Sequence, residues 1–303
     1  MMTSNAAEMV GSRIEEVNNE LQNLGAPFSV QFMSSVKPNL GEVFGFCTKP
    51  RINDDMMHPI IYWEKGFSDL SNRQLAVHII HRYLDASKEM IPGFPEIISR
   101  DYILTNVLPK VIGTDENIQS MAENEIPYEM ISGTDLMAVY YIPVEQTCGT
   151  IQITQQILDL VGISKEEMSD SAKKNVLDQM IIKPMAEIMA EMMGVDYIPE
   201  LDNDSDGIGL TVVTNKAGMY GAGVLVCKEA YIRMSRYIGS DILYILPSSL
   251  HEVLIVKSSD TFSQDDLLQM VTEINGTVVE TADRLTDNVY RYDATTGEIT
   301  HCK

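Results

Sequence analysis

The sequence predicts an α+β protein in which antiparallel sheets, built from meanders and hairpins, are covered by helices. Short apolar runs are separated by clusters of Gly, Pro, Asn and Asp, which are typical of strands joined by tight turns. A meander of strands followed by helices occurs near the amino terminus and is then repeated. Hairpin connections dominate, and they favour antiparallel layers over a doubly wound parallel sheet.

The residue pattern in the first part of the sequence predicts a helix, three strands and a second helix. The opening helix covers residues 5–23 and is closed by Gly25. Its apolar residues at helical spacing are Met9, Ile14, Val17 and Leu21. The strands are expected over residues 28–36, 43–48 and 58–63, and the second helix over residues 72–90, before the proline-containing segment 91–95.

The middle of the chain predicts two further helices near 100–112 and 115–123, then a second meander. The short strands of this meander are expected at 128–132, 136–143 and 150–154, and the helices after it around 155–161, 164–179 and 184–193. Ser164, with Glu167 three residues later, predicts a capping box at the start of the second of these helices. The methionines at 185, 189, 192 and 193 have helical spacing, which predicts buried packing.

Residues 210–256 contain the best-specified core. The pattern predicts a strand, a glycine-rich turn, a strand at 223–227, a helix, a strand from Asp241, a Ser/His/Glu turn and a last strand ending at Val256. The residues expected on buried strands are Val212, Val224, Leu225, Ile242, Tyr244, Leu246, Val253 and Ile255. A helix over 263–274, begun by Ser263, and a strand pair at 288–292 and 298–302 complete the chain.

The weakest point of the apolar pattern lies near residues 113–126. We therefore expect an α+β domain over residues 1–115 and a second over residues 116–303, and the two can also pack as one unit.

The composition limits the classes of function. The formal net charge of −22 repels nucleic-acid phosphates and anionic membranes, so neither is an expected partner. Cys47, Cys148, Cys227 and Cys302 form no CxxC pair. The sequence has no recognisable signal peptide and no apolar run near the ~20 residues that cross a bilayer. These features predict a cytoplasmic protein.

Two patterns could bind metal. Asp202, Asp204 and Asp206 precede Gly207, as in the first half of a calcium-binding EF-hand loop, but Val213 stands where a bidentate Glu is required. A solvated acidic loop is the favoured interpretation. His78, His81 and Asp85 share one helix face and could chelate zinc, although a polar helix surface explains them better. No cofactor is therefore expected, and calcium or zinc remains the alternative.

One turn holds the residue types of a nucleophilic triad, namely Ser248, Ser249, His251 and Glu252. Neighbours in a tight turn rarely reach the geometry of nucleophile, base and orienting group, and no Gly-x-Ser-x-Gly elbow is present. The favoured interpretation is that these residues shape the turn. The glycines at 218, 221 and 223 lack the Lys-Ser/Thr of a phosphate-binding loop and predict a hairpin turn with close backbone approach.

Three phrases carry a family resemblance: 211–222 (TVVTNKAGMYGA), 241–253 (DILYILPSSLHEV) and 287–293 (DNVYRYD). Together with the layout around 142–167, they resemble the bacterial "domain of unknown function 5688" family over most of residues 70–300. The resemblance implies a soluble cytoplasmic bacterial protein, often from gut anaerobes and their mobile elements. It implies no activity and no catalytic residues.

The sequence thus leaves three functions open. A non-enzymatic module that binds another protein is favoured, because no candidate site combines nucleophile, base and orienting group at suitable spacing. The alternatives are a metal-assisted hydrolase and an acidic decoy that inhibits a DNA-binding protein.

Overall fold

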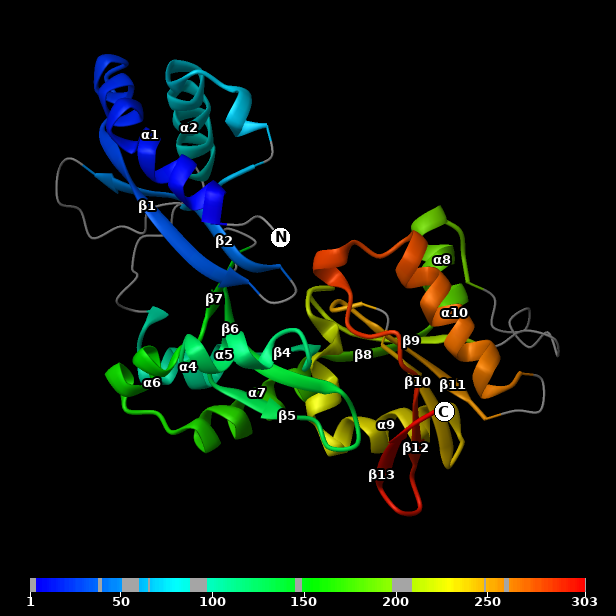
Figure 1. Cartoon of the computed structure of the whole chain (residues 1–303). Coiled ribbons are helices and arrows are strands. Elements are labelled where there is room, and N and C mark those ends of the chain that lie inside the picture. Colours follow the sequence, from blue (N-terminus) through cyan, green and yellow to red (C-terminus); the bar gives the residue numbers. More distant parts are fainter. Residues whose placement is uncertain are drawn as a thin grey trace. The chain divides into compact units, whose positions relative to one another are not determined.

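The computed structural model describes residues 4–37, 40–50, 60–64, 66–87, 97–144, 149–197, 209–247, 249–258 and 262–302. The chain divides into two compact units, the first comprising residues 1–102 with 143–150 and the second comprising residues 103–142 with 151–303. Residues 113–126, where the apolar pattern is weakest, carry the end of a strand and a short helix inside the second unit. Every strand pairing with a described register is antiparallel, so the α+β prediction is confirmed (Figure 1).

Along the described residues, hairpins and short runs of strands are followed by one or two helices. The α-helices are α1 (Ser4–Asn23), α2 (Asn72–Ser87), α4 (Arg100–Asn106), α5 (Ile118–Glu123), α6 (Gln155–Val161), α7 (Lys165–Gln179), α8 (Met185–Met193), α9 (Lys228–Ile238) and α10 (Gln264–Thr277). The 3₁₀ helices are η1 (Phe67–Asp69), η3 (Gly221–Val226) and η4 (Thr281–Asp283). The strands are β1 (Phe28–Lys37), β2 (Gly41–Pro50), β3 (Ile60–Tyr62), β4 (Leu108–Gly113), β5 (Tyr128–Met130), β6 (Leu136–Val144), β7 (Gly149–Gln152), β8 (Met180–Pro184), β9 (Thr211–Asn215), β10 (Ile242–Leu246), β11 (Val253–Lys257), β12 (Tyr290–Asp293) and β13 (Glu298–His301).

The first unit is a three-stranded sheet, in the order β1-β2-β3, packed against α1 and α2. The buried side chains that join these elements include Val17, Leu21, Phe28, Phe46, Leu75 and Ile79. Arg13 of α1 ties the helices together, because its guanidinium donates to Asn72 Oδ1 at 2.7 Å and to the Phe67 carbonyl at 3.0 Å. The unit therefore combines an apolar core with hydrogen bonds from the half-buried Arg13 guanidinium.

The second unit contains a six-stranded sheet in the order β13-β12-β10-β11-β9-β8. Tyr244, Leu246, Leu254 and Val256 pack on one face against α10 and the inner side of α8. The opposite face carries α9 (Figure 1). The Tyr231 ring of this helix stacks on Tyr292 of β12 at 5.2 Å. Because both faces are covered, β10 and β11 carry apolar or aromatic residues on both faces, apart from Lys257 at the end of β11, instead of alternating with polar residues.

A second sheet in this unit follows the order β4-β6-β5, with β7 also paired to β6. Strand β6 is buried along almost its whole length, and α7 packs beside it. Asn175 of α7 donates to the carbonyls of Leu104 and Val107 at 3.1 and 3.0 Å, which fixes the helix to the segment leading into β4.

Three local predictions are wrong. Residues 108–113 form β4, not the end of a helix, because they pair with β6. Val224 and Leu225 are buried as expected, but they lie in the 3₁₀ helix η3 and not on a strand. Met189, Met192 and Met193 of α8 are exposed and not buried.

Helix starts were predicted more accurately. Ser164 Oγ accepts the Glu167 amide at 3.1 Å, and Ser263 with Asp266 forms a full capping box at α10. No helix among the described residues is long and apolar enough to cross a membrane.

Candidate functional site

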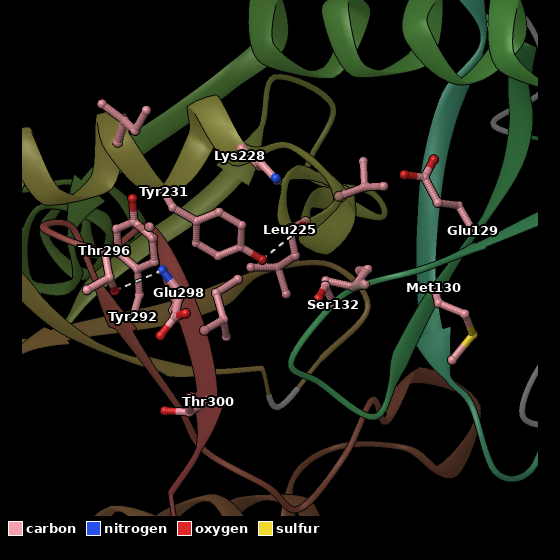
Figure 2. A pocket seen from close by; sticks show the side chains of 15 residues that line it. Glu129, Met130, Ser132, Leu225, Lys228, Tyr231, Tyr292, Thr296, Glu298 and Thr300 are labelled. Atoms are coloured by element: carbon pink, nitrogen blue, oxygen red, sulfur yellow. Dashed lines mark hydrogen bonds between the residues drawn. The ribbon is translucent and has the colours of Figure 1, made fainter.

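A cleft of about 740 Å³ opens in the second unit, a volume within the range of ligand pockets. Figure 2 shows its walls: α9 and η3 on one side, the β12–β13 hairpin on another, and β5 with the turn after it on a third. The aliphatic residues of the lining are Met130, Ile131, Leu225, Val226, Ile232 and Ile299. The cleft is therefore a mixed surface, apolar over much of its area and polar at a few defined positions.

The turn between β5 and β6 is held tightly against β13. Gly133 adopts a positive φ of 81°, and a Cβ at this position would overlap the Ile299 carbonyl oxygen. Only glycine combines this backbone conformation with such a close approach. Thr134 Oγ1 donates to the Ile131 carbonyl at 2.8 Å and so closes the turn on itself. The wall formed by β5 and the wall formed by β13 are thus fixed relative to each other.

Asp135 anchors the same turn to the strand β12. Its carboxylate accepts hydrogen bonds from Thr286 Oγ1 at 2.8 Å, from Asn288 Nδ2 at 3.0 Å and from the buried Tyr290 hydroxyl. Burial alone would raise the pKa of Asp135, but the three donors, Tyr290 foremost, lower the pKa below its ordinary value. The carboxylate is therefore charged and fully used in holding the turn.

Glu129 of β5 lies at the rim of the cleft and belongs to a saturated network. Its oxygens accept from Lys173 Nζ at 2.7 and 2.9 Å, from Ser169 Oγ at 2.6 Å and from the Tyr140 hydroxyl at 3.0 Å. Burial acts to raise the pKa of Glu129, yet the hydrogen bonds and the Lys173 charge lower it overall. A carboxylate held in this way is a poor general base, so its main contribution is to position β5 beside α7.

Lys228 and Glu298 are the charged groups that remain available to a ligand. Lys228 begins α9, is exposed, and forms no ion pair or side-chain hydrogen bond with the described residues. Glu298 begins β13 on the opposite wall and is also exposed (Figure 2). Tyr231 offers only its ring, because its hydroxyl donates to the Leu225 carbonyl at 2.6 Å. The cleft therefore presents one cation and one anion beside its aliphatic residues, while Tyr231 and Tyr292 are only 3% and 4% exposed.

The Ser/His/Glu turn serves the structure. Ser248 lies outside the described residues, and Ser249 is buried, where its Oγ accepts the His251 amide at 2.9 Å. His251 Nδ1 accepts the Tyr220 amide at 3.3 Å, and its Nε2 lies 3.4 Å from Asp283 Oδ1. The ring is thus engaged by a backbone amide and a carboxylate, which is not the arrangement of a base beside a serine nucleophile.

Tyr220, whose amide donates to His251, has an unusual backbone conformation and a closely surrounded ring. Its φ of 54° lies in the left-handed region, which non-glycine residues adopt rarely and at a cost of about 1–3 kcal/mol. The ring is enclosed by Lys110 Nζ at 4.3 Å, by Tyr141 edge-on at 5.0 Å and by the stacked His251 ring at 5.7 Å. Phrases 211–222 and 241–253 thus meet here, since the Gly221 amide also donates to the His251 carbonyl at 3.0 Å.

The possible zinc ligands His78, His81 and Asp85 lie on the helix α2, as the sequence predicted. His78 Nε2 accepts from Arg82 Nε at 3.4 Å, and its ring stands edge-on to Phe67 at 4.8 Å. His81 and Asp85 follow on the exposed side of the helix. The positive charge of the Arg82 guanidinium beside His78 disfavours a metal cation at the same place. In the described part of the chain, no group of three His, Cys, Asp or Glu side chains could hold a metal ion.

The acidic motif of Asp202, Asp204 and Asp206 lies outside the residues that the structure describes. Glu252 is half-buried beside β11. Sequence reasoning missed the cleft residues Glu129, Lys228 and Glu298, since they belong to no motif and come from segments far apart in the chain.

The structure defines an α+β protein of antiparallel sheets with a cleft of mixed polarity. The chain belongs to the family of unknown function DUF5688, whose model matches residues 12–294. No curated protein and no solved structure matches the chain.

Proposed function

We propose that the protein is a non-enzymatic interaction module that holds an extended segment of a partner protein in the cleft beside β13. The observation that carries the proposal is the position of β13 at the end of the six-stranded sheet. Its outer edge pairs with none of the other described strands, although the Gly133 turn contacts it at the Ile299 carbonyl, and residues 296–300 line the cleft. An extended peptide can add to such an edge through main-chain hydrogen bonds while neighbouring pockets select its side chains.

The chemistry of the walls supports a peptide ligand. The aliphatic residues of the lining, Met130 above all because it is 48% exposed, suit apolar side chains. Lys228 and Glu298 stand on opposite walls and would pair with one acidic and one basic group of the same segment. Charged partners at the rim of an interface add specificity more than affinity.

The hydrolase alternative has less support among the described residues. The His251 ring is engaged by Tyr220 and Asp283, and Glu129 is saturated by three side chains. Neither group is free to take a proton from a nucleophile or from water. The decoy alternative needs carboxylates spaced like phosphates along one face, and no described feature favours that arrangement.

The proposal places the module in the cytoplasm. Cys47, Cys227 and Cys302 are free thiols, as expected in a reducing compartment. The net charge of −22 disfavours a direct complex with nucleic acid, so the expected partner is another protein.

A random-peptide display library selected on the whole protein tests the proposal. Peptides that bind are synthesised, and their affinity is measured by fluorescence anisotropy for the wild type and for Lys228→Glu and Thr300→Arg. Lys228→Glu reverses the free cation of the cleft, and Thr300→Arg fills the cleft beside β13. Each is expected to weaken binding about tenfold, the effect of removing a substantial interface contact.

Lys216→Glu provides the matched control, since it makes the same charge change at an exposed lysine that does not line the cleft. The control should keep the wild-type affinity. If no peptide can be selected, or if the selected peptides bind all three variants as tightly as the wild type, the proposal is rejected.

A further inference from the structure

Helix α8 carries apolar residues on two sides. Its inner side chains, Met185 and Ile188, pack against the core below α10. Three others, Met189, Met192 and Met193, have 52%, 83% and 67% of their surface exposed, and they define the methionine face. Single exposed apolar residues are ordinary, but three on adjacent turns of one short helix form a patch of the kind found at interaction sites.

The methionine face continues beyond the helix. Val195, which follows the helix end at Gly194, is 56% exposed. Methionine is flexible and polarisable, so a surface of this composition adapts to an apolar partner without strain.

The charges around the face are predominantly acidic. Between Met180 and Tyr197 the carboxylates are Glu187, Glu191 and Asp196, and the only amine is Lys183. Lys183 Nζ lies 3.0 Å from Glu187 and also contacts Glu191. Glu191 remains 57% exposed and Asp196 is exposed, so part of the negative charge faces solvent.

This charge distribution favours a basic partner protein over a second copy of this chain as the molecule that binds the methionine face. In a symmetric dimer the same patch faces itself, so the carboxylates of one copy, Glu191 and Asp196, would lie in the same interface as those of the other. The net charge of −22 on each chain adds to this repulsion. A partner with an apolar stripe flanked by Lys or Arg gains attraction instead. Such a stripe on a helix matches the face, because α8 itself is a nine-residue helix of about 13 Å.

The geometry points to the methionine face of α8 as a docking site for a basic amphipathic helix of a partner protein. The site lies beside α10, away from β13 and its cleft (Figure 1), so this inference is independent of the function proposed above. The apolar side chains provide contact area, and the carboxylates orient the partner and speed its approach.

The probe is a synthetic peptide of Leu and Lys patterned at helical spacing, with a scrambled peptide of the same composition as its control. Binding to the whole protein is measured by fluorescence anisotropy, and helix formation by circular dichroism. The double variant Met192→Ser, Met193→Ser is expected to weaken binding of the patterned peptide about tenfold. The matched control Leu160→Ser, at a residue of α6 that is 75% exposed, should change the affinity less than about twofold.

Charge is tested separately with Glu191→Gln, which should weaken binding and reduce its dependence on salt. Equal binding of patterned and scrambled peptides would reduce the effect to nonspecific attraction and overturn the inference. So would an unchanged affinity in the double methionine variant. If sedimentation shows a dimer that the methionine variant dissociates, the occupant is a second copy and the inference is wrong. A Lys228→Glu variant should bind the patterned peptide normally, which separates this outcome from the cleft.

Discussion

Asp135 should be the most sensitive polar position of the second unit. It stands in the turn after β5, while its three side-chain donors lie more than 150 residues later in the chain, the Tyr290 hydroxyl 155 residues away. Replacing the carboxylate by Asp135→Ala removes the group that joins the β5–β6 turn to β12. The cleft loses a wall at the same time, because this turn contacts β13.

The magnitude follows from the burial of each donor. Tyr290 is buried, so its hydroxyl loses a charged acceptor and has no water, which costs about 1.5–3 kcal/mol. Thr286 and Asn288 are half-buried and can turn to solvent, so each adds only about 0.5 kcal/mol. We expect Asp135→Ala to lower the free energy of unfolding by about 3 kcal/mol in total.

A double-mutant cycle isolates the contribution of Tyr290. In a Tyr290→Phe background the unsatisfied hydroxyl no longer exists, so Asp135→Ala should cost only about 1 kcal/mol, the contribution of Thr286 and Asn288. Because the chain contains two units, the second is followed through hydrogen exchange of the amides in β10, β11 and β12, which reports its opening free energy. Asp115→Ala is the control, an exposed aspartate of the same unit, and should change that free energy by less than about 0.5 kcal/mol.

The sign of the pH dependence is also fixed. The folded-state pKa of Asp135 is lowered, so the stability it contributes is fully present above the ordinary pKa and is lost as pH falls through the folded value. The stability difference between the wild type and Asp135→Asn should therefore be constant above about pH 5 and shrink below about pH 4. An additive cycle, or a difference that grows as the pH falls, would refute the reasoning.

Three further predictions concern glycine and metal. Gly133→Ala should lower the free energy of unfolding of the second unit by more than about 2 kcal/mol in urea, because the Ile299 carbonyl blocks the new Cβ. Gly162 has a similar φ but open space around it, so Gly162→Ala should cost only about 1 kcal/mol. Metal analysis of the purified protein should find no stoichiometric zinc, and zinc that disappears in His81→Ala would contradict this. Calcium and sodium at matched ionic strength should give the same melting temperature, and a calcium-specific rise that is abolished by Asp204→Asn would establish a site.

Helix caps, the strands β10 and β11 and the antiparallel class could be predicted from the amino-acid sequence, because each depends on residues that are close together in the chain. The capping serines of α7 and α10 were predicted because the serine and the amide that donates to it lie three residues apart. Strands β10 and β11 were predicted because continuous apolar runs between turn residues leave few other solutions. The antiparallel class followed from the same turns, since short connections return the chain beside itself.

The features that could not be predicted depend on contacts between residues far apart in the sequence. Residues 108–113 are apolar enough for a helix or a strand, and pairing with β6 selects the strand. The run at 223–227 was expected to be a strand, but Gly223 packs so closely on the Pro109 carbonyl that the segment winds into η3. The spacing of the α8 methionines identifies a helix without revealing which side meets the core. The cleft is set by contacts such as Asp135 with Tyr290, because only folding brings together residues that the chain separates by half its length.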